Sequence, residues 1–201
     1  MPEPAERAVW TFAVDRPAVV LGSTQPDAVV DRARAAAAGV EVVRRRSGGG
    51  AVHLAPGAVL WVDVVLPRAD PLWDDDVSRS AAWLGSAWGA ALAACGVAAE
   101  VHRGSMVRTR WSSLVCFAGL APGEATVGGA KVLGVSQRRT RAAARFQCAL
   151  LGRWDPVSLL DLLALADADR SAGAADLAAV AAGVPVPLAD VAAALGDALP
   201  A

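Results

Sequence analysis

Short apolar runs and longer helical patterns alternate along the first two-thirds of the chain. The runs are rich in β-branched residues and bounded by Gly, Pro or Asp, which predicts strands. They cover residues 9–14, 18–22, 40–43, 58–66, 113–118, 125–127, 131–136 and 146–151. Apolar residues at helical spacing predict helices over residues 26–38 and 74–94, each followed within two residues by glycine. The alternation predicts an α+β fold, with a mixed β-sheet packed against helices.

The character of the chain changes after residue 155. Three Ala- and Leu-rich stretches, at residues 156–166, 174–182 and 188–199, predict helices separated by Gly and Pro. They carry almost no chemically capable side chains, so we interpret them as packing elements. We therefore expect a catalytic region over residues 1–155, and C-terminal helices over residues 156–201 that pack on it within the same domain.

Composition narrows the classes of protein that fit. The 201 residues include 19 basic and 20 acidic side chains, and 55% are hydrophobic, which excludes intrinsic disorder. A net charge of −1 argues against nucleic-acid and membrane-surface partners. No uncharged apolar run reaches the roughly 18 residues of a membrane helix, and residues 1–7 lack a signal-peptide pattern. Three dispersed cysteines and two histidines predict neither disulfides nor a metal site, so we expect a cytoplasmic protein.

Among the 19 basic residues, only Lys131 is a lysine. Arginine replaces lysine easily on a solvated surface, but not where a compact, rotatable ammonium is needed. Glycines flank this position in Gly128-Gly129-Ala130-Lys131, and glycines allow close approach of a backbone or a ligand. Lys131 is either a chance survivor of an arginine bias or a functional residue.

An apolar strand leads into a turn of three arginines, Ser47 and three glycines. Consecutive glycines let backbone N–H groups point at an anion, and adjacent arginines add forked donors for a carboxylate or phosphate. The alternative is a glycine-rich hairpin with a solvated basic edge, because the motif is neither a P-loop nor a dinucleotide fingerprint.

A second segment combines a cysteine and the single lysine, in Ser113-Leu114-Val115-Cys116-Phe117-Ala118-Gly119 and in the glycine-flanked run around Lys131. Most cysteines in apolar surroundings are small core residues, and Cys95 and Cys148 fit that interpretation. Cys116 is open to either interpretation on these grounds alone.

Together the two segments resemble a known family. Arg44-Arg45-x-Ser47-Gly48-Gly49-Gly50-Ala51-Val52 resembles the signature loop of the lipoate–protein ligase and biotin–protein ligase catalytic domain. Gly129-x-Lys131-Val132-x-Gly134-x-x-Gln137-x-Arg139 is similar to the lysine strand of that family, and the resemblance covers roughly residues 9–190. It implies a biotin/lipoate protein ligase-like fold, related to class II aminoacyl-tRNA synthetases, in which the motif lysine contacts the acyl carbonyl or the activated phosphate ester. The substrate-binding residues it implies are Arg44, Arg45, Ser47, Gly48, Gly49, Gly50, Ala51, Gly129, Gly134 and Gln137.

One class of octanoyltransferases within the family uses a cysteine nucleophile, in a Cys-Phe-x-x-Pro-like segment some 15 residues before the motif lysine. The segment Cys116-Phe117-Ala118-Gly119-Leu120-Ala121-Pro122 is similar to it, and Cys116 precedes Lys131 by 15 positions. The resemblance therefore implies that Cys116 and Lys131 are the catalytic residues. A thiolate at Cys116 needs positive charge nearby, and Lys131 is the candidate.

The chain departs from the family pattern at several positions. The family follows its glycines with Ala-Val, an aromatic residue and His-Asp, whereas this chain has His53 and Leu54 at those positions. Gln147-Cys148 replaces the family's His-Gly before the last core strand. We also expect the N-terminal helix of the family to be missing or very short, and the accessory domain of the larger ligases to be absent. These departures bear on substrate identity and on activity.

We therefore hypothesise a protein-lysine acyltransferase of lipoate metabolism. It would move an octanoyl or lipoyl group from acyl carrier protein to a lysine of a lipoyl domain through a Cys116 thioester, with no cofactor. The first alternative is an ATP- and magnesium-dependent ligase that activates free lipoate as an acyl-adenylate. The second alternative is a lipoyl- or acyl-binding module without catalysis.

Overall fold

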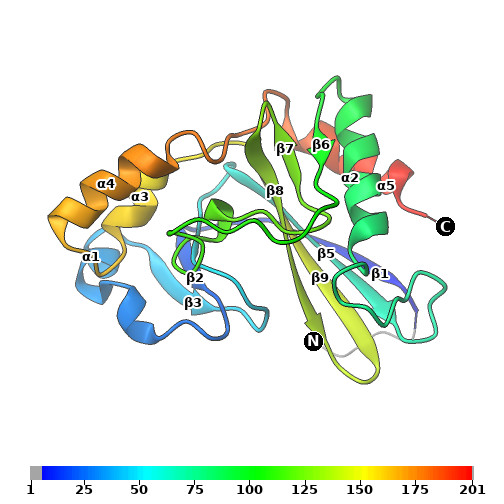
Figure 1. Ribbon diagram of the computed structural model, residues 1–201, viewed down its shortest axis with the longest axis horizontal. Helices are drawn as coiled ribbons and strands as arrows, with labels where there is room; N and C mark the ends of the chain where they lie inside the picture. The colour runs from blue at the N-terminus through cyan, green and yellow to red at the C-terminus, as the bar shows by residue number, and fades with distance from the viewer. Residues whose placement is uncertain (1–5, 201) are drawn as a thin grey trace.

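Two β-sheets with helices on their outer faces make up the computed structural model, which describes residues 6–200 (Figure 1). The larger sheet has six strands, which are all antiparallel to their neighbours. In spatial order they are β1 (Ala8–Phe12), β5 (Val59–Pro67), β9 (Ala143–Leu151), β8 (Ala130–Arg139), β7 (Ala125–Val127) and β6 (Glu100–Val101).

The smaller sheet has three strands in the order β3 (Glu41–Arg44), β2 (Ala18–Leu21) and β4 (Val52–Leu54). β2 pairs in parallel with β3 and antiparallel with β4. All four residues of β2 are buried, because one face of this strand meets helices and the other meets the larger sheet. Its continuous Ala-Val-Val-Leu run is typical of a strand covered on both faces.

Helices cover the two sheets separately (Figure 1). α2 (Ala82–Ala94) and α5 (Leu188–Ala198) pack together on the larger sheet, around Trp88 and Phe146. α1 (Arg32–Ala37), α3 (Pro156–Asp161) and α4 (Asp167–Leu177) pack on the smaller sheet. Between the sheets lies a third apolar cluster that includes Val20, Val52, Phe117 and Ala149, so this cluster joins the two halves of the molecule. The predicted α+β class is confirmed.

One predicted strand is wrong. Residues 113–118 do not form a strand; Cys116–Ala118 form a short 3₁₀ turn, η2. Only Val115 makes a strand-like bridge, with Ala51. Periodicity cannot separate these structures, because a short apolar run reads the same whether it is buried as a strand or as a turn.

Several predicted helices have the wrong bounds. The predicted helix 26–38 is split into η1 (Asp27–Val29) and α1, because the Asp31 side chain accepts hydrogen bonds from the N–H groups of Ala33 and Arg34 and begins a new helix there. The predicted helix 74–94 begins only at Ala82. The aspartates before it cap turns instead: Asp74 accepts from the Asp76 N–H and Asp76 from the Ser78 N–H. α3 ends at Asp161 rather than 166, and α4 lies before most of the predicted helix 174–182.

No helix within residues 6–200 has the length and apolar character needed to cross a membrane.

Candidate active site

The glycine loop packs directly against the turn that carries Cys116. The Ala51 N–H donates to the Leu114 carbonyl at 2.8 Å, and the Cys116 N–H donates to the Ala51 carbonyl at 2.9 Å. A Cβ on Gly50 would lie 2.6 Å from the Val115 backbone, so only glycine allows this approach. The two motifs of the sequence therefore meet in the fold.

Arg45 holds the glycine loop from inside the molecule. Its side chain is buried, with 7% exposed, and its Nη2 donates to the carbonyls of Gly48 at 2.8 Å and Gly50 at 2.9 Å. The same nitrogen lies 3.8 Å from Cys116 Sγ. The positive charge next to the thiol therefore belongs to Arg45, whereas the sequence had pointed to Lys131 for this contact.

Lys131 is more deeply buried than Cys116 and contacts the turn that carries it. It is 3% exposed, and its Nζ donates to the Gly119 carbonyl at 2.8 Å and to the Cys116 carbonyl at 3.3 Å. Its third contact is an ion pair with Glu124 Oε2 at 2.6 Å. An ammonium has three protons, and each has a partner here. Lys131 therefore clamps both ends of the turn that presents the thiol.

A register shift between β7 and β8 helps to place this lysine. Ala125 pairs with Leu133 and Thr126 with Lys131, which leaves Val132 as an extra residue in β8. Such a bulge changes which face of the sheet the following side chains take. Lys131 Nζ lies 5.0 Å from the centre of the Phe117 ring, and a Cβ on Gly134 would lie 3.3 Å from that ring. Gly134 therefore gives Phe117 room to lie close to the strand.

Three polar side chains link the glycine loop to the larger sheet. Ser47 Oγ donates to Gln147 Oε1 at 2.7 Å and lies 2.9 Å from Ser136 Oγ. Ser47 is 1% exposed, so these contacts satisfy a buried hydroxyl. Gln147, which stands where the family has a histidine, thus fixes the loop in place.

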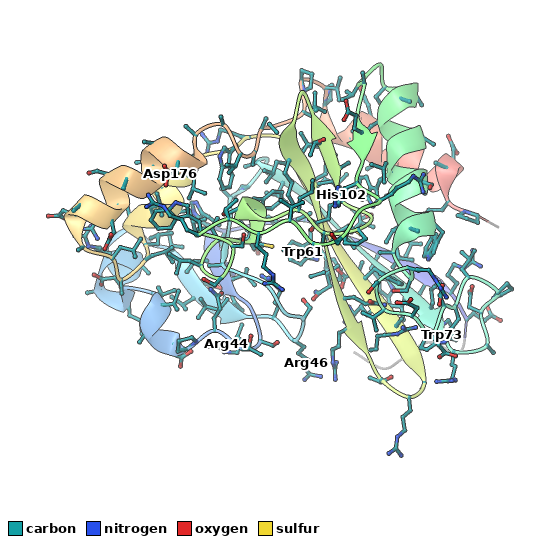
Figure 2. All side chains as sticks on the ribbon, in the orientation of Figure 1. Arg44, Arg46, Trp61, Trp73, His102 and Asp176 are labelled. Carbon is teal, nitrogen blue, oxygen red and sulfur yellow. The ribbon has the colours of Figure 1, made fainter. Side chains whose placement is uncertain are left out.

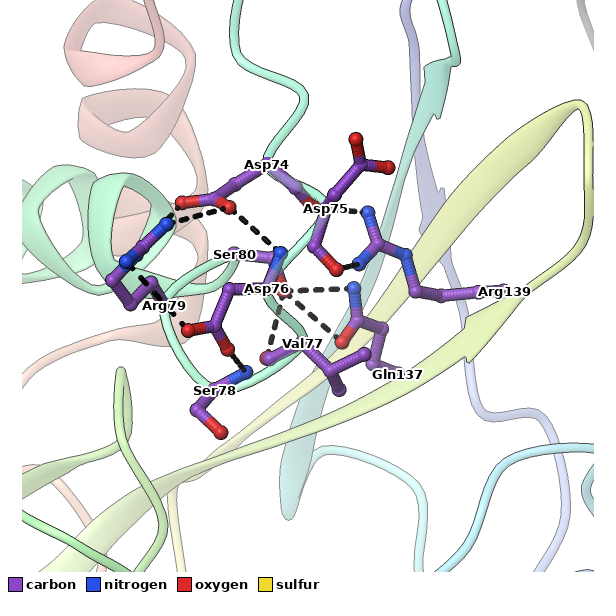
Figure 3. Close-up of polar contacts among 9 residues, drawn as sticks. All are labelled: Asp74, Asp75, Asp76, Val77, Ser78, Arg79, Ser80, Gln137 and Arg139. Atoms are coloured by element: carbon purple, nitrogen blue, oxygen red, sulfur yellow. Dashed lines mark hydrogen bonds and ion pairs between the residues drawn. The ribbon is translucent and has the colours of Figure 1, made fainter.

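Other predicted site residues lie apart from Cys116. The Gln137 side chain bonds Ser80 before α2, and the neighbouring Arg139 donates to the backbone carbonyls of Asp74 and Asp75 (Figure 3). Gly129 forms the β7–β8 turn with a φ of 82°, and no atom lies within 4 Å of where its Cβ would be. Both positions shape the fold around the site rather than its surface.

Arg44 connects the end of β3 to the loop that follows β2. Its guanidinium donates to the carbonyls of Gly22 and Gln25 at 2.7 and 2.6 Å, and it also pairs with Asp27. The pair lowers the pKa of the Asp27 carboxyl through its hydrogen bond with Arg44. Gly22 is itself held closely, since a Cβ there would lie 1.8 Å from the Gly49 carbonyl oxygen.

Two cavities near the thiol share lining residues. A narrow slot of about 10 Å³ lies against Cys116, Phe117 and Gly134. A wider cleft of about 540 Å³ opens between the smaller sheet and β1. It is lined by apolar side chains such as Val20 and Leu54 and by charged ones such as Arg16, Glu41 and Arg145. Arg45, Trp61 and Gln147 line both cavities, and Figure 2 shows Trp61 at the centre of the molecule and Arg44 and Arg46 along its lower edge. The cleft falls within the size range of small-molecule sites.

Glu124 is the site residue that the sequence analysis missed. Its carboxylate is 4% exposed and accepts from the Ala121 and Val135 N–H groups at 2.7 and 3.0 Å, besides its pair with Lys131. A signal was present: Glu124 is the only acidic residue between Val101 and Trp154, in the same stretch as the only lysine.

The histidines do not join the thiol. His53 lies near Asp155 in a separate small cavity, and burial lowers the pKa of its imidazole. The His102 ring contacts the Ser105 carbonyl at 2.8 Å. Over the described part of the chain, no group of three or more His, Cys, Asp or Glu side chains is arranged to hold a metal ion.

The sequence model of the lipoyl protein ligase A/B catalytic domain matches residues 2–195. The chain belongs to this family. A search of curated protein sequences gives no match. The predicted family and its fold are confirmed, and the chain is a lipoate–protein ligase-like catalytic domain.

Solved structures of family members have the same fold. A bipartite lipoate protein ligase of Thermoplasma acidophilum, described with its E2 lipoyl domain, is 19% identical with a TM-score of 0.78, over 98% of this chain and 71% of that chain. A lipoate-protein ligase A bound with ATP is 20% identical with a TM-score of 0.72, over 98% and 73%. LipL1 of P. falciparum in complex with lipoate is 12% identical with a TM-score of 0.62, over 94% and 45%.

Proposed function

We propose that this lipoyl protein ligase family member transfers an octanoyl or lipoyl group to a lysine of a lipoyl domain through a thioester on Cys116. The observation that carries the proposal is the position of the thiol. Cys116 is half-buried between the glycine loop and the narrow slot, with the Arg45 guanidinium 3.8 Å from Sγ. The thiolate is the nucleophilic form of a cysteine, and reactive cysteines lie beside cationic side chains.

The reaction has two exchanges at one carbonyl carbon. The Cys116 thiolate attacks the carbonyl of a donor thioester; the new C–S bond forms, and the donor thiolate leaves and takes up a proton. The neutral amine of the acceptor lysine then attacks the Cys116 thioester. An amide bond forms, the Cys116 thiolate leaves, and the proton lost by the amine passes to solvent. Neither exchange needs an oxidant, a metal ion or ATP.

The glycine loop is suited to stabilise the charge that develops on the carbonyl oxygen. Gly48 and Gly49 are exposed, and their N–H groups have no hydrogen-bond acceptor within residues 6–200. A Cβ on Gly49 would lie 3.8 Å from Cys116 Sγ, so the loop borders the reacting atoms. Backbone N–H groups fixed beside a reacting carbonyl stabilise an oxyanion.

Lys131 supports the thiol turn in the resting site. To donate to an acyl carbonyl, its ammonium must give up one of its three present contacts. The hydrogen bond to the Cys116 carbonyl is the longest of the three. In this account Lys131 keeps its contacts with Gly119 and Glu124 during transfer, and its third N–H donates to the acyl oxygen.

The wide cleft provides space for the acyl tail. Its apolar lining includes Val20, Val43 and Leu54, and it shares Arg45, Trp61 and Gln147 with the slot at Cys116. The slot at Cys116 is too small for a carbonyl group and its neighbouring carbons, so substrate entry requires movement of the Arg45 or Trp61 side chain.

A ligase that uses ATP and magnesium is the second candidate, and the same loop favours it. The exposed N–H groups of Gly48 and Gly49 fit the phosphate of an acyl-adenylate. ATP would supply the activated mixed anhydride, and the chain's own residues would bind its phosphate and orient the acyl carbonyl near Lys131.

The direct test of the proposed reaction is the donor requirement for labelling an unmodified lipoyl domain. We expect modification with octanoyl–acyl carrier protein in the absence of ATP. Modification only with octanoate or lipoate plus ATP and magnesium would establish the ligase instead. Tight binding of the lipoyl domain or acyl group without modification under either condition would establish a binding module.

A further inference from the structure

Residues 102–112 form a strap, a loop that begins at His102 (Figure 2), is exposed over residues 103–110 and is hydrogen-bonded to the segment around the Cys116 turn. Val107 exchanges backbone hydrogen bonds with Leu120, at 2.8 and 3.0 Å, just beyond that turn. Thr109 Oγ1 donates to the Ala118 carbonyl at 2.8 Å, within the turn itself. The strap is thus fixed to the segment of the chain that bears the thiol.

The strap presents apolar side chains to solvent. Met106 is 40% exposed and Val107 is 50% exposed, and arginines 103, 108 and 110 stand beside them. Methionine and arginine are enriched at protein–protein interfaces, and methionine adapts its shape to different partners. Two exposed apolar residues in sequence, paired with the segment that follows Cys116, are therefore typical of a contact surface.

Arginine dominates the charge of the two chain segments that meet at the thiol. Residues 42–62 and 101–123 contain six arginines and no Asp or Glu, and they are flanked directly by Glu41, Asp63, Glu100 and Glu124. Arg110 pairs with Asp176, and Arg44 with Asp27. Arg46 and Arg108 are exposed, and neither makes an ion pair within residues 6–200.

We propose that Arg46, Met106, Val107 and Arg108 form the docking surface for an acidic acceptor domain, the domain that carries the lysine to be acylated. This inference rests on the proposed function. A lysine has only a flexible four-carbon stem, so its nitrogen reaches the Cys116 thioester only when the surface of the acceptor domain lies against the rim of the site. An acidic surface around that lysine complements unpaired arginines at the rim and is steered toward them.

The experiment separates loading of the thiol from transfer to the acceptor. Loading is measured with octanoyl-N-acetylcysteamine, a small uncharged thioester that does not need a docking surface. Transfer is measured from the loaded enzyme to an unmodified acidic lipoyl domain and, separately, to hydroxylamine. The test variant is Arg46→Glu with Arg108→Glu, and a second variant is Met106→Ser with Val107→Ser. Arg141→Glu with Arg153→Glu is the matched control, because both side chains are exposed and lie outside the strap and the glycine loop.

We expect the arginine variant to load at the wild-type rate and to react normally with hydroxylamine. Its kcat/KM for the lipoyl domain should fall at least about tenfold at low salt, through KM, and this difference should shrink as salt is added. The apolar variant should lower kcat/KM at every salt concentration. Equal rates for the test and control variants would overturn the docking surface and leave the thioester mechanism standing. Failure of the wild-type protein to load would count against the proposed function itself.

Discussion

Lys131 and Glu124 form an ion pair of 2.6 Å in which both side chains are almost fully buried. Glu124 is further anchored by two backbone N–H groups, and Lys131 by two carbonyls of the thiol turn. The pair thus connects β8 to the turn that presents Cys116. A buried charge destabilises the protein strongly when its counter-charge is removed.

Glu124→Gln should therefore destabilise the protein by about 3–5 kcal/mol, the usual cost of breaking one side of a buried ion pair. The reason is that the Lys131 ammonium would stay buried without a counter-charge. Urea unfolding measures the loss, with Glu100→Gln, on the exposed strand β6, as the control. Replacement of both partners, Glu124→Leu with Lys131→Met, should recover part of the loss. Equal stabilities for the Glu124 and Glu100 variants would show that the pair contributes nothing.

Two glycines of the same loop should respond differently to alanine. A Cβ on Gly50 would meet the Val115 and Cys116 backbone at 2.6–2.7 Å, whereas no atom lies within 4 Å of a Cβ on Gly48. Gly50→Ala should cost about 1–3 kcal/mol through overpacking and should slow loading of Cys116, because the loop and the turn must separate. Gly48→Ala should change stability little. Thermal unfolding of the two variants tests this, and a reversed order would contradict the packing described.

Cys116 and Cys148 should differ in reactivity toward iodoacetamide. Cys148 is fully buried, and burial raises its pKa to about 12, so it should stay unmodified in the native protein near neutral pH. Cys116 is half-buried beside Arg45 and should be alkylated. Peptide mapping by mass spectrometry after native and denatured labelling gives the comparison. Modification of Cys148 in the native state, with Cys116 spared, would be incompatible with the structure.

The cleft should set the length of the acyl group. Val20 is a buried residue of β2 that lines it, so Val20→Phe should reduce the available volume. We expect kcat/KM for octanoyl donors to fall about tenfold relative to butanoyl donors. The ratio of the two rates on purified protein is the measurement, and an unchanged ratio would place the acyl tail elsewhere.

The N-terminus of α3 should make stability depend on acid pH. Asp155 accepts from the Ser158 hydroxyl and N–H, and these hydrogen bonds lower the pKa of its carboxyl. The stabilisation is therefore present above the unfolded value of 3.8 and is lost as the pH falls through the lower folded value. Asp155→Ala should cost about 1 kcal/mol at neutral pH, and the difference from wild type should shrink below pH 3.8. A difference that stays constant from neutral to acid pH would argue against this cap.

Local chemistry predicted much of the fold. The β-branched runs predicted most strands of the larger sheet, because their flanking turn residues mark both ends. The pairing of distant segments was not predictable from periodicity alone. The residues around Ala51 give no indication that its backbone forms hydrogen bonds with Leu114 and Cys116. The split near Asp31 was missed because the competing cap is a side-chain hydrogen bond that hydrophobic spacing does not record.

The candidate site shows the same limit. The family resemblance picked out Cys116, Lys131 and the glycine loop, which do lie together. It did not indicate that Arg45, rather than Lys131, lies beside the thiol, since that depends on which way each side chain turns. The partner of Lys131 also depends on tertiary structure, because Glu124 reaches it across the β7–β8 bulge.

The most direct measurement of the central claim is the intact mass of the protein after incubation with octanoyl–acyl carrier protein in the absence of ATP. The account predicts a single octanoyl adduct that maps to Cys116, is removed by hydroxylamine, and is missing in Cys116→Ala but present in Cys95→Ala. Absence of any adduct on the folded wild-type protein, with lipoyl-domain labelling that needs ATP, would contradict the thioester mechanism.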